Sequence, residues 1–457
     1  MTAALTRRTI YRFLPDGLFG AFCLAIPALY NSYPLITADS GAYISNGYLL
    51  QMPLDRPIAY SVLVRISSLG ISLWGVVAVQ ALIVSLLLLV LARQLLGAAY
   101  SRRIFSAVML LIGAATSAGW FVGQIMPDMF TPLMLLGILI LYLIPGSRIA
   151  VAGLAILIVG CMLMHNSNML IGLLLGAVLL IRAWRTGNAM LRRTGIVLLA
   201  VAAISWISLS SMNAIAGRGF RPSAGSHVFI MSRMVENGIM DNFLDDYCPA
   251  DPEAYKLCAY RDRLPGRQWE FMWNEHSPLY ATGGWQANEE EYGRIIAKTL
   301  TTPKYIGLHV IKATHATFRQ MPLLYVGDGL QQYEQASSPA REINAHFKGE
   351  EKEFHASEQQ HRGRHLEWWN PLIIIFSLAS IIAALILPLG RNINKTPPAF
   401  RSALRIILLF LLLNAAVTAS LATVIGRYEA RVFWVLPFLS ILYIVRSLYY
   451  RKAAAMD

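Results

Sequence analysis

Acidic residues are scarce in the apolar parts of this 457-residue chain, and several stand beside residues suited to acid and base chemistry. Asp39 lies in LITADSGAYISNGY, which begins where the first long apolar run ends. Asp128 lies in GQIMPDMFTPLML, and Glu429 lies in IGRYEARVFW between Arg427 and Arg431. A carboxylate can take a proton from a hydroxyl, and arginine binds phosphate through paired N–H groups. These positions are the first candidates for a reaction site.

Each candidate also has a structural explanation that the sequence leaves open. Asp39 can act as the N-cap of a helix expected over residues 40–51, and Asp128 can cap the apolar helix that follows it. The polar cluster of MHNSNML, which contains His165 and Asn166, is also typical of a turn. The arginines beside Tyr428 fit either a phosphate clamp or anchoring at a membrane surface.

A second amphipathic segment follows the stretch around Asp39. In MPLDRPIAYSVLVRISSLGISLW, Pro57 occupies a natural first position of a helix. Apolar residues then recur on one face, while Ser61, Arg65 and Ser68 share another. This pattern predicts a helix in the membrane interface, with a packed connector as the alternative.

Composition places these residues in a membrane protein. Hydrophobic residues make up 56% and charged residues 14% of the chain, and the mean hydropathy is +0.50. A helix that crosses a bilayer needs about 20 mostly apolar residues, and about ten windows approach that length. They lie near residues 17–36, 74–92, 104–123, 129–144, 149–165, 169–181, 195–213, 371–389, 406–425 and 432–449. We expect an all-α polytopic membrane bundle of about ten transmembrane helices.

Charge predicts the orientation of this bundle. Alternate connecting segments, together with both ends of the chain, hold 18 Lys and Arg, with Asp16 and Asp457 as their acids. Positively charged loops stay on the cytoplasmic side, so we expect both termini in the cytoplasm, with the bacterial inner membrane as the location. The net charge of +13 and the pI of 9.6 largely follow from this topology. They predict contact with a lipid bilayer and no nucleic-acid partner.

One large insertion separates the seventh predicted span from the eighth. It divides the chain into residues 1–213, 214–370 and 371–457. We expect the insertion to be mainly helical and periplasmic. Cys248 and Cys258 are the two cysteines outside the apolar spans, and they close a short polar loop. A disulfide between them fits an oxidising compartment.

Three parts of the insertion bear on function. Arg218 and Arg221 come directly after the seventh span and are expected near the mouth of the bundle if the chain folds back. The tryptophans of GRQWEFMWNEHSPLYATGGW fit a core with membrane anchors better than a sugar-binding groove. Residues 294–321 are expected to form a helix against the membrane.

The stretch YPLITADSGAYISNGYLLQMPLDRPIAYSVL resembles the first outer loop of the GT-C superfamily, the integral-membrane glycosyltransferases that use lipid-phosphate-linked sugars. In that family an acidic residue follows the first span, a tyrosine follows in the juxtamembrane helix, and a basic residue with proline precedes a second helix. Here these positions are filled by Asp39, Tyr43, Arg56, Pro57 and, just after them, Tyr60. MPDMF is similar to a second acidic element of the family and assigns Asp128. The insertion after the seventh span is similar to the layout of protein O-mannosyltransferases, and the aminoarabinose transferases belong to the same group.

The resemblance implies transfer of a sugar from a polyprenyl-phosphate donor to a glycan, lipid or protein acceptor on the outer face, with inversion at the anomeric carbon. It implies Asp39 as the general base, with Asp128 orienting the acceptor or tuning Asp39. Contacts to substrate are expected from Tyr43, Arg56, Tyr60, His165, Asn166, Arg218, Arg221, Arg427, Tyr428 and Arg431. Many members have Asp-Glu where this chain has Asp39-Ser40, so the cofactor is left unknown and a divalent metal is not indicated.

Other classes of protein remain as alternatives. A lipid-linked glycan polymerase or ligase would use the same donors. A lipid-saccharide carrier needs access from both faces, whereas the polar groups here gather on one. An assembly protein without catalysis would need neither Asp39 nor the paired arginines. No HExxH, Walker or nucleophile-elbow motif occurs in the chain, which disfavours hydrolase and nucleotide-driven classes.

Overall fold

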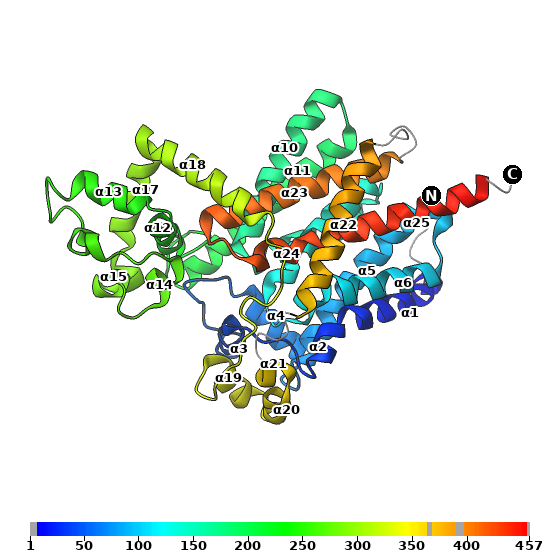
Figure 1. The fold of residues 1–457 in the computed structure, drawn as a ribbon, viewed down its shortest axis with the longest axis horizontal. Helices are drawn as coiled ribbons and strands as arrows, with labels where there is room; N and C mark the ends of the chain where they lie inside the picture. The colour runs from blue at the N-terminus through cyan, green and yellow to red at the C-terminus, as the bar shows by residue number, and fades with distance from the viewer. Residues whose placement is uncertain (1–6, 363–367, 390–396, 455–457) are drawn as a thin grey trace.

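The computed structural model of the protein describes residues 7–362, 368–389 and 397–454. Within these ranges the chain is helical, and its one β-contact is an isolated parallel bridge between Leu35 and Gln124. Helices α1 (Arg7–Leu24) and α25 (Val435–Ala454) lie toward one end of the molecule, the insertion helices within residues 226–320 lie toward the other, and those within residues 338–362 lie at the lower edge of the view (Figure 1). Part of the predicted inner segment 390–405 lies outside the described residues. The predicted all-helical class is confirmed for the described part.

Five helices are long and apolar enough to cross a membrane, and they are Trp74–Ala99, Asn166–Thr186, Ala189–Ile215, Pro398–Leu421 and Gly426–Ala454. Four shorter apolar helices accompany them, at Phe13–Leu24, Pro127–Leu143, Arg148–Met164 and Asn370–Ile386. In the described part of the chain the protein is therefore a helical membrane protein with five such helices. The predicted count of ten crossings remains a prediction.

The bundle contains helices of very different lengths because several apolar runs are interrupted. Its elements are α1 (Arg7–Leu24), α2 (Ile26–Tyr30), α5 (Trp74–Leu96), η1 (Gly97–Ala99), α6 (Arg102–Ala115), α7 (Ala118–Gly123), η2 (Pro127–Met129), α8 (Phe130–Leu143), α9 (Arg148–Met164), α10 (Asn166–Thr186), α11 (Ala189–Ile215), α22 (Asn370–Leu389), α23 (Pro398–Leu421), α24 (Gly426–Phe433) and α25 (Val435–Ala454).

The prediction of one continuous first span over residues 17–36 is wrong. Helix α1 ends at Leu24, α2 covers Ile26–Tyr30, and no helix covers the residues between Tyr30 and Ala38. Pro27 lies in the first turn of α2, where its missing N–H is tolerated, but it cannot continue the hydrogen-bond ladder of α1. Helical structure therefore ends well before Asp39, although Tyr33, Leu35 and Ile36 remain in the core of the bundle.

The predicted span 104–123 is also broken, into α6 and α7. Thr116 is extended between them, and its hydroxyl donates to the Ile112 carbonyl at 2.5 Å and accepts from the Ala118 amide at 3.2 Å. Gly123, at the end of α7, accepts a bond from the Leu35 amide at 2.9 Å, and the Ile125 amide donates to the Leu35 carbonyl at 3.0 Å. The two breaks thus bring the segments before Asp39 and Asp128 side by side.

The first outer loop contains α3 (Ala38–Leu49) and α4 (Ala59–Ser68). Helix α4 begins two residues after Pro57, the predicted first position. Its serines Ser61 and Ser68 are buried, whereas Ile66 is exposed. Ile58 and Val62 are partly buried. Only part of the predicted apolar stripe therefore faces outward, and the place of this helix in the membrane interface remains a prediction.

The insertion contributes to two different hydrophobic cores. Its first part has a core of its own, built around residues such as Met231, Phe243 and Tyr292. The second part, from Leu324 to Phe354, joins the core of the bundle. The helices are α12 (Ser226–Glu236), α13 (Ile239–Tyr247), η3 (Lys256–Arg263), α14 (Gln268–Trp273), α15 (Pro278–Ala281), α16 (Gly284–Ala287), α17 (Glu289–Thr301), α18 (Pro303–Gln320), α19 (Ser338–His346), α20 (Glu351–Ala356) and α21 (Glu358–Arg362).

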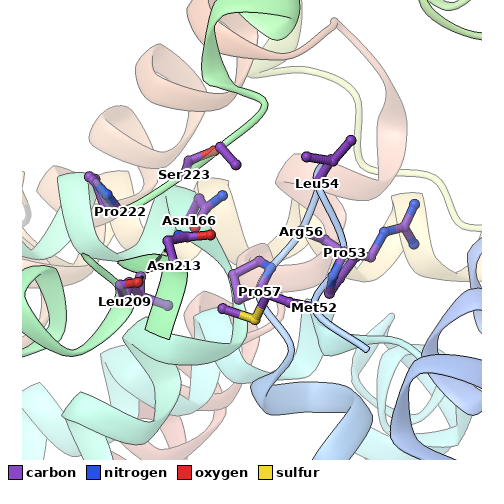
Figure 2. A pocket seen from close by; sticks show the side chains of 11 residues that line it. Met52, Pro53, Leu54, Arg56, Pro57, Asn166, Leu209, Asn213, Pro222 and Ser223 are labelled. Atoms are coloured by element: carbon purple, nitrogen blue, oxygen red, sulfur yellow. Dashed lines mark hydrogen bonds between the residues drawn. The ribbon is translucent and has the colours of Figure 1, made fainter. Parts of the chain in front are cut away.

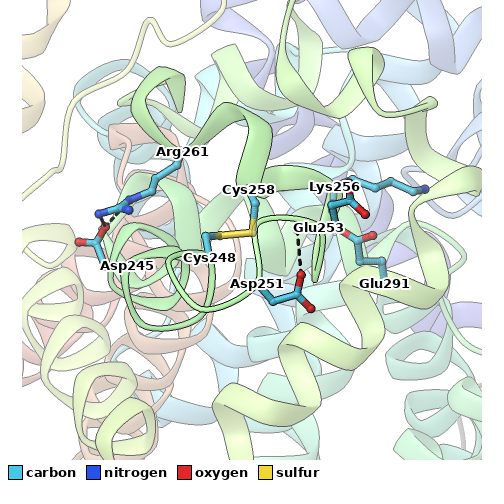
Figure 3. The surroundings of a disulfide bond; sticks show 8 residues. All are labelled: Asp245, Cys248, Asp251, Glu253, Lys256, Cys258, Arg261 and Glu291. Atoms are coloured by element: carbon cyan, nitrogen blue, oxygen red, sulfur yellow. Dashed lines mark hydrogen bonds and ion pairs between the residues drawn. A yellow bond between two sulfur atoms is a disulfide. The ribbon is translucent and has the colours of Figure 1, made fainter.

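Cys248 and Cys258 are joined in a disulfide that links the end of α13 to η3 (Figure 3). Beside it, the Arg261 Nε donates to the Asp245 carboxylate at 2.7 Å. Trp269, from the nearby α14, is 56% exposed. This tryptophan therefore does not belong to the core, and under the favoured interpretation of the aromatic stretch it would be one of the membrane anchors.

The second part of the insertion holds the segment that leads into α3. The side chain of Gln359 accepts from the Ile36 amide at 3.0 Å and donates to the Ile36 carbonyl at 2.6 Å. The Tyr33 hydroxyl donates to the buried Glu350 carboxylate at 2.8 Å. Since these bonds satisfy backbone and side-chain groups away from water, they fix the position at which α3 begins.

Candidate functional site

Acidic and basic side chains from distant parts of the sequence meet in one cluster. Asp39 comes from α3, Arg56 from the loop before α4, Asp128 from η2, and Arg427 and Arg431 from α24. The Arg56 Nη2 lies 3.0 Å from the Asp39 Oδ1, and the Arg427 Nη1 lies 3.6 Å from the Asp39 Oδ2. The Arg431 Nη1 lies 2.7 Å from the Asp128 Oδ1. These five predicted residues are therefore neighbours.

Asp39 is not the N-cap of its helix, so that interpretation is wrong. Thr37 is the N-cap, and its backbone amide donates to the Ser40 Oγ at 2.9 Å in a reciprocal capping box. The Asp39 carboxylate is therefore available to the two arginines. Its side chain is 32% exposed. Burial raises the pKa of Asp39, but the charges and hydrogen bonds of Arg56 and Arg427 outweigh burial and leave this pKa below its usual value.

Ser40 has a structural task that explains why it is not a second acid. Its side chain is fully buried, takes part in the capping box, and donates to the Ile125 carbonyl at 2.9 Å. A carboxylate at this position would be desolvated between backbone groups and would not face Arg56 or Arg427. The packing of α3 against the segment after α7 therefore explains why this chain has Ser40 where the family pattern has a Glu.

Asp128 is also not a helix cap. It is buried in η2, and its Oδ1 accepts from the buried Arg431. The Arg431 Nη2 also donates to the Asn414 Oδ1 at 3.2 Å and to the Ser167 Oγ at 3.4 Å. Asn414 comes from α23, and its amide donates to the Glu429 carboxylate at 2.9 Å. One arginine thus connects η2, α10, α23 and α24.

Arg427 lies between the two acidic residues. Besides its contact with Asp39, its Nε is 3.9 Å from the Asp128 Oδ2, a separation longer than a hydrogen bond. Neither of these two atoms has a hydrogen-bond partner, although both are buried. The Arg427 backbone amide donates to the Asp328 carboxylate at 2.8 Å. Arg427 is therefore held at its backbone while its side chain retains unused donor capacity.

Aromatic rings border the arginines on both sides. The Tyr428 ring centroid lies 5.3 Å from the Arg427 guanidinium and 5.2 Å from the Arg431 guanidinium. The Arg56 guanidinium lies 5.0 Å from the centroid of Tyr43. These separations are within cation–π range, so the rings restrict the orientation of each guanidinium.

The predicted tyrosines of the first outer loop pack against each other. The ring centroids of Tyr43 and Tyr60 are 4.9 Å apart at an interplanar angle of 85°. The Tyr60 hydroxyl donates to the Gln80 side chain at 3.1 Å. Tyr60 is fully buried, so it supports Tyr43 rather than facing the open side of the cluster.

A small pocket opens beside Arg56 (Figure 2). It lies between the loop before α4, the start of α10 and the end of α11. The side-chain oxygen of Asn166 is buried there and has no hydrogen-bond partner. His165 is the N-cap of α10, and its Nδ1 lies 2.7 Å from the Ser167 Oγ. Asn166 therefore lines this pocket, whereas His165 supports the residue that contacts Arg431.

Arg218 and Arg221 do not join the cluster. The Arg218 Nη1 donates to the Pro53 carbonyl at 2.6 Å, and its Nη2 donates to the Met52 carbonyl. The Arg221 Nη2 donates to the Glu289 carboxylate at 3.1 Å. Both arginines hold the loop before α4 and the start of the insertion in place, which is a positioning role.

Several contributors to the cluster were not among the predicted site residues. Asp55 accepts from the Arg56 Nε at 2.7 Å, and Asp328 and Asn414 hold α24. Asn414 is a polar residue inside an apolar span, a pattern that itself points to a functional site. Asp328 lies far from Arg427 in sequence, and no local signal marks it.

Among the described residues, no group of three or more His, Cys, Asp or Glu side chains is arranged to hold a metal ion. The carboxylates of the cluster face arginines instead. Comparisons with protein-family models, curated proteins and solved structures found no match to this chain.

Proposed function

We propose that the protein is a GT-C-like membrane glycosyltransferase, which moves a sugar from a polyprenyl-phosphate donor to a glycan, lipid or protein acceptor of the cell envelope. The observation that carries this proposal is the half-buried carboxylate of Asp39 placed between two arginines at the edge of a helical membrane bundle. A carboxylate for the acceptor's proton and cations for a phosphate are the two requirements of this transfer.

The proposed location follows from charge and the disulfide. A bundle of about ten crossings, with both termini in the cytoplasm, places the cluster on the outer face. The disulfide between Cys248 and Cys258 fits a periplasmic insertion, because disulfides persist in oxidising compartments. On this proposal the protein lies in a bacterial inner membrane.

The proposed reaction is a single displacement at the anomeric carbon. An acceptor hydroxyl attacks that carbon from the side opposite the phosphate, and its proton passes to Asp39. The bond between the anomeric carbon and the phosphate oxygen breaks, and its electron pair leaves with polyprenyl phosphate. Negative charge therefore grows on the phosphate, where arginine donors stabilise it.

The unused donors of the cluster support this use of the arginines. The Arg56 Nη1, the Arg427 Nε and the Arg431 Nε are all buried without a hydrogen-bond partner. A buried polar group without a partner costs free energy. A phosphate that accepts from Arg56 and Arg427 would remove part of that cost, and Arg431 would hold Asp128 in place.

Donor binding would also activate Asp39. A carboxylate with a lowered pKa is a weak base in the resting site. A phosphate that takes over donors of Arg56 and Arg427 would weaken their stabilisation of the carboxylate and add negative charge nearby. Both effects raise the pKa of Asp39. The base would therefore become competent when the donor is present.

Two alternatives remain, and they differ in what happens to the donor. A polymerase or ligase for lipid-linked glycans shares the chemistry and differs only in its acceptor. A carrier or assembly protein would bind the same lipid without breaking a bond. The polar cluster lies at one end of the bundle rather than along a path through it, which favours an enzyme over a carrier.

The test uses the purified full-length protein in lipid nanodiscs with a panel of radiolabelled polyprenyl-phosphate sugars and a cell-envelope fraction as acceptor. The proposal predicts label in the acceptor and release of polyprenyl phosphate for at least one donor. Saturable donor binding without either product, across the panel, would favour a carrier or assembly protein.

A further inference from the structure

Helix α18 of the insertion presents an apolar face that no part of the described chain covers. Val310 is 60% exposed, Ile311 is 63% exposed and Phe318 is 68% exposed. The opposite face is packed, with Tyr305 and Ala316 buried. Large exposed side chains of this kind on one face of a helix are unusual in water and mark an interaction surface.

The charge of α18 also differs from that of its surroundings. Residues 303–320 contain Lys304, Lys312 and Arg319 and no acidic residue, whereas the insertion as a whole has 17 basic and 20 acidic residues. An apolar face flanked by lysine and arginine is typical of helices that lie on anionic lipid surfaces.

The neighbour of α18 establishes which surface it meets. Helix α18 packs against α23, one of the helices long and apolar enough to cross a membrane (Figure 1). On α23, Leu408, Leu412 and Leu421 are exposed, as expected for side chains that face lipid. The apolar surface therefore continues from a membrane-spanning helix onto α18.

We propose that α18 lies in the plane of the membrane surface, with Ile311 and Phe318 among the acyl chains and Lys312 and Arg319 at the level of lipid phosphates, while Lys304 stays paired with Asp246. The partner is the phospholipid bilayer itself. Such helices bury their apolar face about 5–10 Å into the boundary between headgroups and acyl chains. This proposal does not depend on the proposed glycosyl transfer.

The position of α18 has a consequence for the cluster of charged residues. Gln320, the last residue of α18, accepts from the Ile425 amide at 3.1 Å and donates to the Ile425 carbonyl at 2.7 Å. Ile425 immediately precedes α24, which carries Arg427. A helix fixed at the membrane surface would therefore hold Arg427 close to the depth of lipid phosphates.

The test places a fluorescent label on single cysteines in full-length protein reconstituted in nanodiscs of phosphatidylglycerol and phosphatidylcholine. Phe318→Cys and Ile311→Cys report on α18, Leu412→Cys on a lipid-facing position, and Glu290→Cys on an exposed, charged position of the insertion. The native cysteines do not interfere, because two are buried and two form the disulfide. Lipids that carry a doxyl group near the headgroup serve as the quencher.

The proposal predicts that these lipids quench the labels at both α18 positions several-fold more than the label at Glu290. A doxyl group deep in the acyl chain should instead favour the label at Leu412. If the labels on α18 are quenched no more than the label at Glu290, α18 faces water and the proposal is wrong. Either result can be obtained whether or not the protein transfers sugar.

Discussion

The charge state of Asp39 depends on two arginines that come from opposite ends of the chain. Arg56 precedes α4 and Arg427 begins α24, yet both contact the same carboxylate. Because they lower the pKa of Asp39, this residue stays ionised at pH values where an isolated carboxyl begins to take up a proton. The proposed base is thus in its charged form before any substrate arrives.

Replacement of one arginine should move the pH dependence of transfer. Arg56→Gln removes a charge that lowers the pKa of Asp39, so this pKa should rise. Protonated Asp39 cannot accept a proton, and the acidic limb of kcat/KM should therefore move to higher pH. The pH profile of kcat/KM measures this shift directly, since it reports the free enzyme.

The control for this shift is Arg261→Gln, which removes an exposed arginine from the ion pair with Asp245. Its acidic limb should coincide with that of the unmodified protein. A limb that stays in place in Arg56→Gln, or moves to lower pH, would contradict the assignment of Asp39 as the base.

Helix α24 is short, and its place depends on contacts with other elements. Arg431 connects it to η2 through Asp128 and to α23 through Asn414. Asn414 also donates to the Tyr428 carbonyl at 2.7 Å. A buried charge that loses its partner is strongly destabilising, so the pair of Asp128 and Arg431 is a sensitive point of the bundle.

Asp128→Asn and Arg431→Met should each reduce stability by about 3–5 kcal/mol, because each leaves the other charge buried without its partner. The double variant should be less destabilised than the sum of the two. Thermal unfolding of the detergent-solubilised protein measures both effects. For the exposed pair of Asp245 and Arg261, Arg261→Met should cost less than about 1 kcal/mol. If Arg431→Met and Arg261→Met lowered stability by the same amount, the pair of Asp128 and Arg431 would not behave as a buried ion pair.

The N-terminus of α3 offers a second prediction at this scale. Ser40→Ala removes one half of the capping box and leaves the Thr37 amide and the Ile125 carbonyl without their partner. Loss of a cap costs about 1 kcal/mol, and Asp39 should become less well placed. We expect a lower melting temperature and a lower kcat, with Ser40→Thr closer to the unmodified protein. An unchanged kcat in Ser40→Ala would show that the cap does not position Asp39.

The sequence predicted much of the cluster but not the contacts inside it. Scarce acids and paired arginines in apolar surroundings singled out Asp39, Asp128, Arg427 and Arg431, and the structure brings these four residues together. The interpretation of Asp39 as a cap was wrong, because Thr37 takes that position through its bond with Ser40. Contacts between distant segments, such as that of Asp328 with the Arg427 backbone, have no periodic signal in sequence.

For whole helices, the sequence likewise predicts approximate positions but not the ends that depend on local backbone contacts. Periodicity located most apolar helices, but hydrophobicity alone could not show that α1 ends at Leu24 or that α6 ends at Ala115. Those ends depend on the backbone effects of Pro27 and on the hydroxyl of Thr116, which competes for helix carbonyls. The sequence predicts the insertion as one segment between two apolar spans, whereas burial assigns its two parts to different cores.

Over the whole molecule, these two cores separate the charged cluster from the disulfide. The cluster rests on the bundle core, which includes Leu324 and Leu330 of the insertion. The bond between Cys248 and Cys258 lies beside the other core, which contains Phe243 and Phe271. Loss of packing in the core around Phe243 and Phe271 should therefore leave the charged cluster largely intact.

Reduction of the disulfide tests this separation. The bond joins residues 10 apart in sequence, and closure of a loop of that size stabilises the folded state by about 2–3 kcal/mol. The Cys248→Ser, Cys258→Ser double variant should expose residues 226–305 to protease while helices of the bundle stay protected. Transfer should fall much less than protease resistance. If transfer and protease resistance fell equally, the bundle and the part of the insertion around the disulfide would unfold together.

The most direct test of the central claim is the initial rate of sugar transfer by Asp39→Asn, measured beside the unmodified protein and Asp245→Asn with a donor that supports turnover. The account predicts a loss of about 100-fold or more in Asp39→Asn, since a positioned base contributes about 10²–10⁴. Asp245→Asn, which alters an exposed carboxylate, should keep its rate. Transfer by Asp39→Asn at the rate of the unmodified protein, with equal expression and folding, would contradict the account.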